Sequence, residues 1–296
     1  MTGGERQALD PSAAAGGGER FAPRERGRPL GGTTQERSVL AAAALLFLGC
    51  ALVFDSFLTT ANLLAIARSV AALGILSIAM AIVVIGRGID LSLVATMGMA
   101  VTVTLHLLET TAGSYAPAVL AGLGLCAGMG ALNGLLVAFV EIPALFATFA
   151  TGLLVVGFTR TFIVKSYVIE VPKGLDLILY FGQGRAFGVP LPIVVFAVVA
   201  LVAHVALSRT IFGWFLYAQG DNPAAARLTG IPVRPLTVLQ FALAAMLAYL
   251  AGLVIVGTVG GFDSRIVQSA LIFDVLTVVV VGGVSLAGGR GGVPSV

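Results

Sequence analysis

Charged residues are scarce in this sequence. Asp, Glu, Lys and Arg together make up 10% of its 296 residues, whereas hydrophobic residues make up 58%. A soluble domain carries about 25% charged residues, and a chain with so few could not cover a water-facing surface. The composition therefore excludes an ordinary soluble protein. It predicts an all-α integral membrane protein, a polytopic bundle of helices whose apolar faces lie in lipid.

Residues that could carry out chemistry are also few. The two cysteines, Cys50 and Cys126, lie far apart inside apolar runs, which excludes a disulfide framework and favours two small buried side chains. His106 and His204 fall in separate apolar segments, with no carboxylate at a catalytic spacing. We therefore expect no catalytic residue, no metal site and no enzymatic activity in this chain alone.

A nucleotide-binding loop is missing as well. The sequence has no match to GxxxxGK[ST]. Its glycine-rich stretch ending at Gly289 continues with Arg290 and Gly291, where Lys and then Ser or Thr would be required. A transporter built on this chain would need another subunit to hydrolyse ATP. We expect this chain itself to bind no cofactor.

The first 37 residues differ from the rest of the chain. They are rich in Gly, Ala, Arg, Pro and Glu and have almost no aliphatic clusters, which predicts disorder. Basic residues mark the cytoplasmic side of a membrane protein, and several arginines precede the first apolar run, among them Arg20, Arg24, Arg26, Arg28 and Arg37. The tail has no series of aromatic residues between its arginines, such as a nucleic-acid-binding patch would have. We expect residues 1–37 to be a disordered cytoplasmic tail with no nucleic-acid partner.

Apolar segments long enough to span a bilayer follow this tail. A helical span needs about 20 residues, and about eight segments reach that length. They lie near residues 38–57, 63–86, 91–109, 117–140, 144–164, 190–208, 235–260 and 267–288. Residues 38–296 should form one transmembrane domain. Two glycine pairs in the fourth segment have the small-xxx-small spacing that favours close helix packing, Gly124/Gly128 and Gly130/Gly134.

A long loop with helix signals, residues 208–234, separates the sixth and seventh segments. Asn222 suits the N-cap, Pro223 suits the first helical position, and Gly230 can end a helix in the left-handed conformation. The signals predict a helix of about two turns, which is too short to be stable alone in water. It either packs on its own membrane domain or docks onto a cytoplasmic partner.

A second unusual loop, Gly86–Ser92, joins the second and third segments and reads GRGIDLS. Ionisable side chains near membrane depth are costly and usually face a cavity or a partner, and interrupted helices often flank transport sites. Asp90 is such a side chain. Alternatively, the loop is an ordinary interfacial turn in which Asp90 or Ser92 caps the third segment.

Six stretches of the sequence together resemble one family of transport proteins. They are FLTTANLLAI (57–66), GRGIDLS (86–92), NGLLVA (133–138), IPALFATFATG (142–152), YAQGDNPAAARLTGI (217–231) and GGVSLAGGRG (282–291). In this order they resemble the permease subunits of ribose-type ABC sugar importers, a family that also includes branched-chain amino-acid permeases. The resemblance covers nearly everything after the tail.

The resemblance implies roles for individual residues. The cytoplasmic segment by which such permeases contact their ATPase matches Gly220, Asp221, Asn222, Ala224, Ala225, Arg227 and Gly230. A signature near the translocation pathway matches Gly88, Ile89, Asp90 and Ser92, and we place Asn133 of the NGLLVA stretch with it. The resemblance assigns no residue to contact with the substrate.

The resemblance also implies the remaining parts of an importer. The chain would form the pathway for a small polar solute, a monosaccharide of ribose or xylose type, across a bacterial plasma (inner) membrane, with its N-terminus in the cytoplasm. Its partners would be an ABC ATPase subunit, a periplasmic or lipid-anchored substrate-binding protein, a second permease chain in a homo- or heterodimer, and membrane lipid. ATP would be used by the partner ATPase.

The chain departs from the family at its end. Family members continue beyond the GGVSLAGGRG stretch into further membrane spans, whereas this sequence stops at Val296. We therefore expect C-terminal spans to be missing, which leaves an inactive truncated fragment as one alternative. An ion-coupled secondary transporter is another. It would carry paired acids at mid-membrane within inverted repeats, and the sequence has few such acids and no clear inverted repeat.

Overall fold

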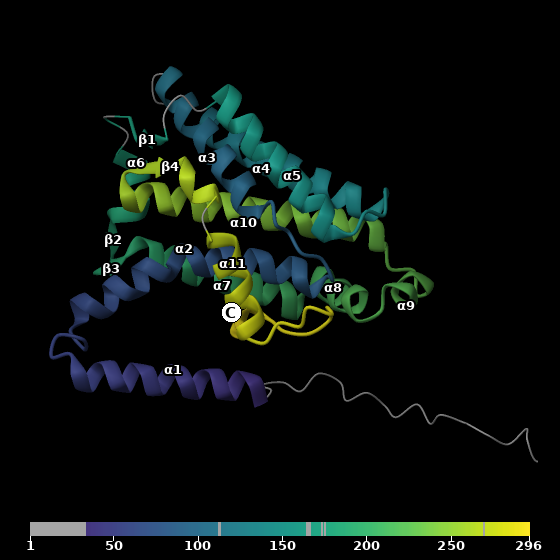
Figure 1. Ribbon diagram of the computed structural model, residues 1–296, viewed down its shortest axis with the longest axis horizontal. Helices are drawn as coiled ribbons and strands as arrows, with labels where there is room; N and C mark the ends of the chain where they lie inside the picture. The colour runs from purple at the N-terminus through teal and green to yellow at the C-terminus, as the bar shows by residue number, and fades with distance from the viewer. Residues whose placement is uncertain (1–33, 112–113, 164–166, 173, 175, 269) are drawn as a thin grey trace, which may run out of the picture. The chain divides into compact units, whose positions relative to one another are not determined.

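The computed structural model describes residues 34–111, 114–163, 167–172, 174, 176–268 and 270–296. The expected N-terminal tail lies outside these residues except for its last four, which already belong to the first helix. Eleven helices appear in this part of the chain (Figure 1): α1 (Thr34–Val53), α2 (Thr60–Ile85), α3 (Leu93–Thr110), α4 (Tyr115–Ala138), α5 (Ala144–Phe158), α6 (Asp176–Gln183), α7 (Leu191–Arg209), α8 (Ile211–Asp221), α9 (Pro223–Leu228), α10 (Val233–Val259) and α11 (Leu271–Val281).

Among the described residues, six helices are long and apolar enough to cross a membrane. They are α2, α3, α4, α7, α10 and the continuous helix made by α5 and the π-helical turn η2 (Thr159–Ile163). They confirm the prediction of an all-α polytopic membrane protein. The two other expected segments correspond to shorter apolar helices, Arg37–Val53 within α1 and Leu271–Val281. The 11 residues of α11 rise only about 16 Å, half of the hydrocarbon thickness.

Helix α10 lies between α4 and α2 and also contacts α3 and α6 (Figure 1). In lipid, helices associate through close packing and hydrogen bonds, so small residues gather where backbones approach. The buried residues of α10 include a run of this kind: Ala244, Ala245, Ala248, Ala251 and Gly252. Packing of small residues therefore places α10 at the centre of the described bundle.

The glycine pairs of α4 behave differently from each other. A Cβ atom at Gly130 would lie 2.5 Å from the carbonyl oxygen of Phe241, and one at Gly134 would lie 2.5 Å from the Cα atom of Val238. Gly124 and Gly128 have nothing within 4 Å of such an atom. The prediction of close packing is therefore confirmed for Gly130/Gly134. Within the described residues of this chain, it is wrong for Gly124/Gly128.

The second half of α2 is the most enclosed part of the bundle. Every residue from Ile75 to Ile85 is buried, because α7, α10 and α11 surround this half of the helix. A helix that is apolar on all sides suits such an interior position. Consequently α2 carries the loop Gly86–Ser92 into the interior of the protein.

The segment between α5 and α7 contains short elements that the sequence analysis did not identify. Strand β1 (Val168–Glu170) pairs antiparallel with β4 (Gly261–Asp263), which follows α10, and β2 (Arg185–Ala186) pairs with β3 (Val189–Pro190). Helix α6 packs against α10. Each element is too short to show a clear hydrophobic period in the sequence. The 3-10 turns η3 (Ser264–Gln268) and η4 (Val293–Ser295) complete the described structure.

Candidate functional site

The loop Gly86–Ser92 has a fixed and partly strained backbone. Arg87 has a φ of +69°, a left-handed conformation that is uncommon for a residue other than glycine. The amide of Gly88 donates a hydrogen bond to the carbonyl of Val83 at 2.9 Å. A Cβ atom at Gly88 would lie 3.0 Å from the ring of Phe241, so this glycine lets α10 pass directly behind the loop. Backbone strain of this kind is concentrated at functional sites.

Three of the predicted pathway residues, Asp90, Ser92 and Asn133, meet in a buried hydrogen-bond network. Oδ1 of Asp90 accepts hydrogen bonds from the backbone amide of Ser92 at 2.9 Å and from its hydroxyl at 2.6 Å. The side-chain amide of Asn133 donates to the Ser92 hydroxyl at 2.7 Å, and the Thr151 hydroxyl donates to Oδ1 of Asn133 at 2.6 Å. The network joins the start of α3 to α4 and α5.

The backbone of the loop is fastened to α5 as well. The Thr148 hydroxyl accepts a hydrogen bond from the amide of Leu91 at 3.0 Å and lies 3.1 Å from the carbonyl oxygen of Ile89. Sequence reasoning did not single out Thr148 or Thr151. Their spacing of three residues on an otherwise apolar helix places both hydroxyls on one face, which is the signal that could have identified them.

Asp90 has an unusual electrostatic environment for a carboxylate. It lies in the loop between two candidate spans and is only 1% exposed. Burial raises the pKa of its carboxyl group to about 6, although the hydrogen bonds from Ser92 act in the opposite direction. Its second oxygen, Oδ2, has no hydrogen-bond partner among the described residues. Asp90 is therefore a buried acid bonded to Ser92, the residue before α3, and its role beside the pathway stays a prediction.

The predicted helix in the loop 208–234 is present as α9, and its ends follow the sequence signals. The side-chain oxygen of Asn222 accepts hydrogen bonds from the amides of Ala224 and Ala225, both at 3.1 Å, and Pro223 is the first helical residue. Gly230 has a φ of +84°. The helix has six residues, shorter than the expected two turns. It is preceded by α8, which the sequence analysis had interpreted as loop.

Most of α9 faces outward. Ala226 is its one buried residue, whereas Ala224, Ala225 and Arg227 are exposed and Leu228 is 90% exposed. Asp221 and Asn222, which precede the helix, are exposed too. Packing of α9 on its own membrane domain therefore explains the burial of Ala226 and leaves its other side chains unexplained. The exposed leucine and alanines form a small apolar surface beside a positive charge.

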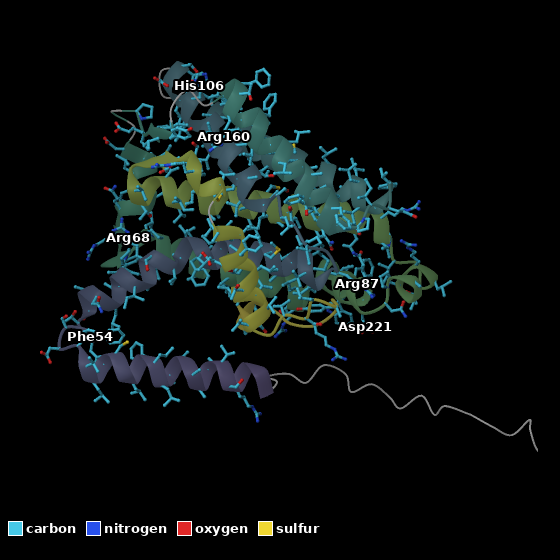
Figure 2. The ribbon with its side chains drawn as sticks, in the orientation of Figure 1. Phe54, Arg68, Arg87, His106, Arg160 and Asp221 are labelled. Atoms are coloured by element: carbon cyan, nitrogen blue, oxygen red, sulfur yellow. The ribbon has the colours of Figure 1, made fainter. Side chains whose placement is uncertain are left out.

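Three of the motif stretches meet at α8. The side-chain amide of Gln219 donates to the carbonyl of Gly86 at 3.2 Å, and the hydroxyl of Tyr217 donates to the carbonyl of Gly291 at 2.8 Å. The amide of Gly289 donates to the carbonyl of Ile85 at 2.9 Å. A side chain at Gly220 would collide with the backbones of Ile85 and Gly289. Figure 2 shows Arg87 and Asp221 at this same end of the helices.

A hollow of about 170 Å³ lies between α9 and the loop Gly86–Ser92. Three arginines line it, Arg87, Arg227 and Arg234, together with one acid, Glu141. Arg234 and Glu141 form an ion pair at 3.0 Å, and Glu141 has a φ of +62°. Arg87 and Arg227 form no ion pair within the described part of the chain, so the hollow has an excess of positive charge. Sequence reasoning did not connect these residues, which come from four separate segments.

Comparison with known proteins identifies the relatives of this chain. Residues 62–292 match the family model described as "Branched-chain amino acid transport system / permease component". A ribose import permease protein of Escherichia coli K12 is 32% identical over 258 residues, which cover 87% of this chain and 79% of the relative. No solved structure matches the chain.

Two further relatives carry other names. A fructose import permease protein of Rhizobium meliloti is 29% identical to this chain, and the matched region spans 80% of this chain and 67% of the relative. A galactofuranose transporter permease protein of Escherichia coli K12 is 34% identical, and the matched region spans 74% of this chain and 63% of the relative. With six candidate membrane-spanning helices and a family match over most of its length, the chain belongs to the permease family of binding-protein-dependent ABC importers that includes the ribose type.

Proposed function

We propose that this chain is the permease subunit of an ABC importer and forms the membrane pathway for a monosaccharide of ribose or xylose type. The observation that carries the proposal is the junction at α8, where the exposed helix α9, the loop Gly86–Ser92 and the stretch 282–291 are joined by hydrogen bonds. The names of the relatives support a sugar as the solute, since they include ribose, fructose and galactofuranose permeases.

The mechanism requires a partner that hydrolyses ATP. An ABC ATPase subunit docks on the exposed face of α9, and its closure on ATP moves α9 and α8 together. Gln219 and Gly220 then transmit this movement to Gly86 and Ile85, and through the loop to the network of Asp90, Ser92 and Asn133. Because that network joins α3, α4 and α5, a shift of the loop changes how these helices pack and opens the pathway to the other side.

The remaining parts of the importer complete the proposal. A second permease chain lines the pathway from the opposite side, and a periplasmic or lipid-anchored binding protein delivers the sugar. Residues 1–37 form a cytoplasmic tail and residues 38–296 the permease domain in a bacterial plasma membrane. This orientation rests on the arginines that precede the first apolar segment.

Docking is tested by reversing one charge on α9. We expect Arg227→Glu to abolish co-purification of a co-expressed ribose-type ABC ATPase and ATP-dependent ribose uptake into liposomes. Arg209→Glu, the same change at an exposed arginine at the end of α7, serves as the control and should keep both. Normal assembly and uptake with Arg227→Glu would overturn the docking role. Uptake driven by an ion gradient without the ATPase would instead favour a secondary transporter.

A further inference from the structure

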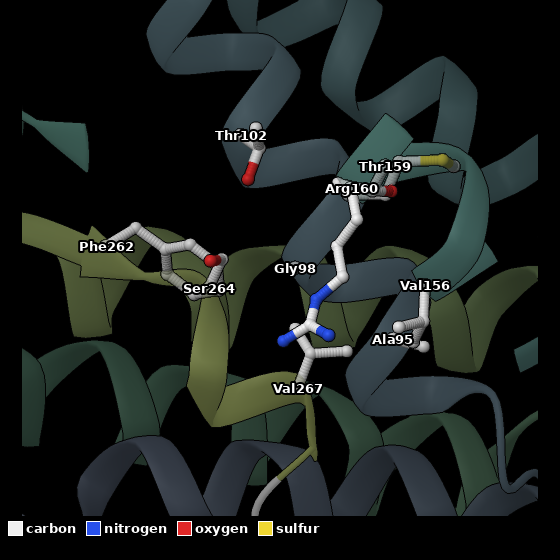
Figure 3. Close-up of a pocket in the computed structure, with 10 residues that line it drawn as sticks. Ala95, Gly98, Thr102, Val156, Thr159, Arg160, Phe262, Ser264 and Val267 are labelled. Atoms are coloured by element: carbon white, nitrogen blue, oxygen red, sulfur yellow. The ribbon is translucent and has the colours of Figure 1, made fainter. Parts of the chain in front are cut away.

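A second pocket lies beside the first half of α3 and the C-terminal end of α5, and several polar side chains line it. Figure 2 shows Arg160 far from Arg87 and Asp221, and Figure 3 shows the pocket around it. The pocket is lined by residues of α3, α5, η2, β4 and η3, among them Thr102, Thr159, Arg160, Phe262 and Ser264. The mechanism described so far uses none of these side chains.

Two hydroxyl groups in this pocket have no partner. Thr102 is 1% exposed and Thr159 is 8% exposed, and neither hydroxyl oxygen makes a hydrogen bond within the described part of the chain. Thr102 points into the pocket in Figure 3. A buried threonine in a helix can donate to the carbonyl one turn earlier, as Thr104 does to Ala100 at 2.8 Å. Since buried polar groups normally find partners, unpaired hydroxyls that line a pocket point to a group that binds there.

The guanidinium of Arg160 extends into the same pocket (Figure 3). It forms no hydrogen bond or ion pair with the described residues. Its guanidinium carbon lies over the ring of Tyr167, 5.8 Å from the ring centre, in a cation–π contact. The nearby acid, Asp263, is already paired with Arg265 at 2.7 Å. A charge at a helix end in a membrane protein usually faces a partner or a pathway. The N–H donors of the Arg160 guanidinium have no acceptor among the described residues.

The helical backbone is irregular around Arg160. Thr159 and Arg160 open the π-helical turn η2, in which α5 widens before it ends. Such widened turns often occur at functional sites, because they redirect side chains that a regular helix would place elsewhere. Arg160 is otherwise exposed, so its side chain could swing outward without breaking a hydrogen bond.

The pocket is small and partly open. Its volume is about 10 Å³, room for a single water molecule and far less than a sugar ring requires. A sugar could enter only when Arg160 moves aside, and its hydroxyl groups would then be the first hydrogen-bond partners of the two threonine hydroxyls.

We propose that Thr102, Thr159 and Arg160 form a contact site for the hydroxyl groups of the transported sugar, with Arg160 as the residue that admits it. The inference rests on the proposed function. The threonine hydroxyls can donate and accept, and the guanidinium can donate to several sugar oxygens at once. Helix geometry also links the two polar sites, since Thr102 lies ten residues beyond Ser92 on α3, about 15 Å along the helix.

The test compares sugar transported with ATP hydrolysed in liposomes that hold the chain, its ATPase and a saturating binding protein loaded with ribose. We expect Thr102→Val and Arg160→Gln each to lower the sugar transported per ATP about tenfold, the effect of losing one good hydrogen bond. The stimulated ATPase rate should stay the same. Thr102→Ser, which keeps the hydroxyl, should restore the ratio.

The control is Thr104→Val on the same helix. The Thr104 hydroxyl bonds to the hydroxyl of Tyr249 at 2.7 Å inside the bundle, so its loss should lower thermal stability and leave the transport ratio unchanged. Wild-type ratios in Thr102→Val and Arg160→Gln would overturn the contact site while leaving the importer intact. Failure of the wild-type complex to take up ribose, xylose or fructose with ATP would overturn the proposed function, and the contact site with it.

Discussion

At the scale of single residues, the glycines of α4 offer a matched pair of substitutions. Gly130→Ala places a methyl group 2.5 Å from the Phe241 carbonyl, so we expect it to destabilise the protein by about 1–3 kcal/mol through overpacking. Gly124→Ala enters open space and should be neutral or stabilise the helix by up to about 1 kcal/mol. Thermal unfolding in detergent measures both. Equal effects of the two changes would contradict the packing of α4 on α10.

The buried acid Asp90 predicts a pH dependence of stability. Its pKa is raised from 3.8 to about 6, so the folded protein binds the proton more tightly than the unfolded chain does. The stabilising contribution of the protonated form is complete below pH 3.8 and is lost as the pH rises through about 6. We expect melting temperatures of the wild type to fall between pH 4 and pH 7. Asp90→Asn should remove most of this slope, and an unchanged slope would place the cause elsewhere.

The hydrogen-bond network predicts a further single-residue effect. Asn133→Leu keeps a similar volume but removes the hydrogen bonds of Asn133 with the hydroxyls of Ser92 and Thr151, and each lost hydrogen bond costs about 0.5–1.5 kcal/mol. The variant should therefore unfold at a lower temperature than the wild type. Asn62→Leu, at a half-buried position near the start of α2, is the comparison and should change stability less. A similar loss in both variants would show that the network adds little.

At the scale of elements, the sequence allowed the long helices to be predicted and missed the short ones. Continuous apolar runs fix α2, α4 and α10 to within a few residues, because a backbone in lipid must be helical. The caps of α9 were also predictable, since Asn222, Pro223 and Gly230 act through local geometry. Helices α6 and α8 were missed because the contacts that hold them come from distant segments.

The coupling between α8 and the loop Gly86–Ser92 can be tested at the same scale. We expect Gln219→Leu to retain the ATPase but to lose sugar uptake, since it removes the hydrogen bonds that join α8 to the Gly86 carbonyl and to Thr237 and Gln240 of α10 without altering α9. Asn222→Ala removes the helix cap, costs about 1 kcal/mol locally and should weaken ATPase binding instead. Loss of the ATPase from Gln219→Leu would show that α8 supports docking and not transmission.

At the scale of the whole molecule, positive charge gathers in the hollow beside α9, where we propose that the ATPase docks. The hollow beside α9 brings together Arg87, Arg227 and Arg234 with the single acid Glu141, although these residues come from separate parts of the sequence. Neither their meeting nor the polar pocket at Arg160 could be predicted from sequence, because both depend on how distant helices pack. The family resemblance identified the stretches, and the fold shows which of them touch.

The excess positive charge predicts that docking depends on salt. An acidic surface on the ATPase would be attracted to this hollow, and attraction between exposed charges weakens as the Debye length falls from about 10 Å at 0.1 M salt to about 3 Å at 1 M. We expect ATPase binding to weaken steadily over this range. Arg87→Gln should weaken binding at low salt and flatten the dependence, because one unpaired charge is removed. Arg185→Gln, in a strand outside the hollow, should leave both unchanged. A wild-type salt dependence in Arg87→Gln would mean that Arg87 takes no part in the attraction and that other charges cause it.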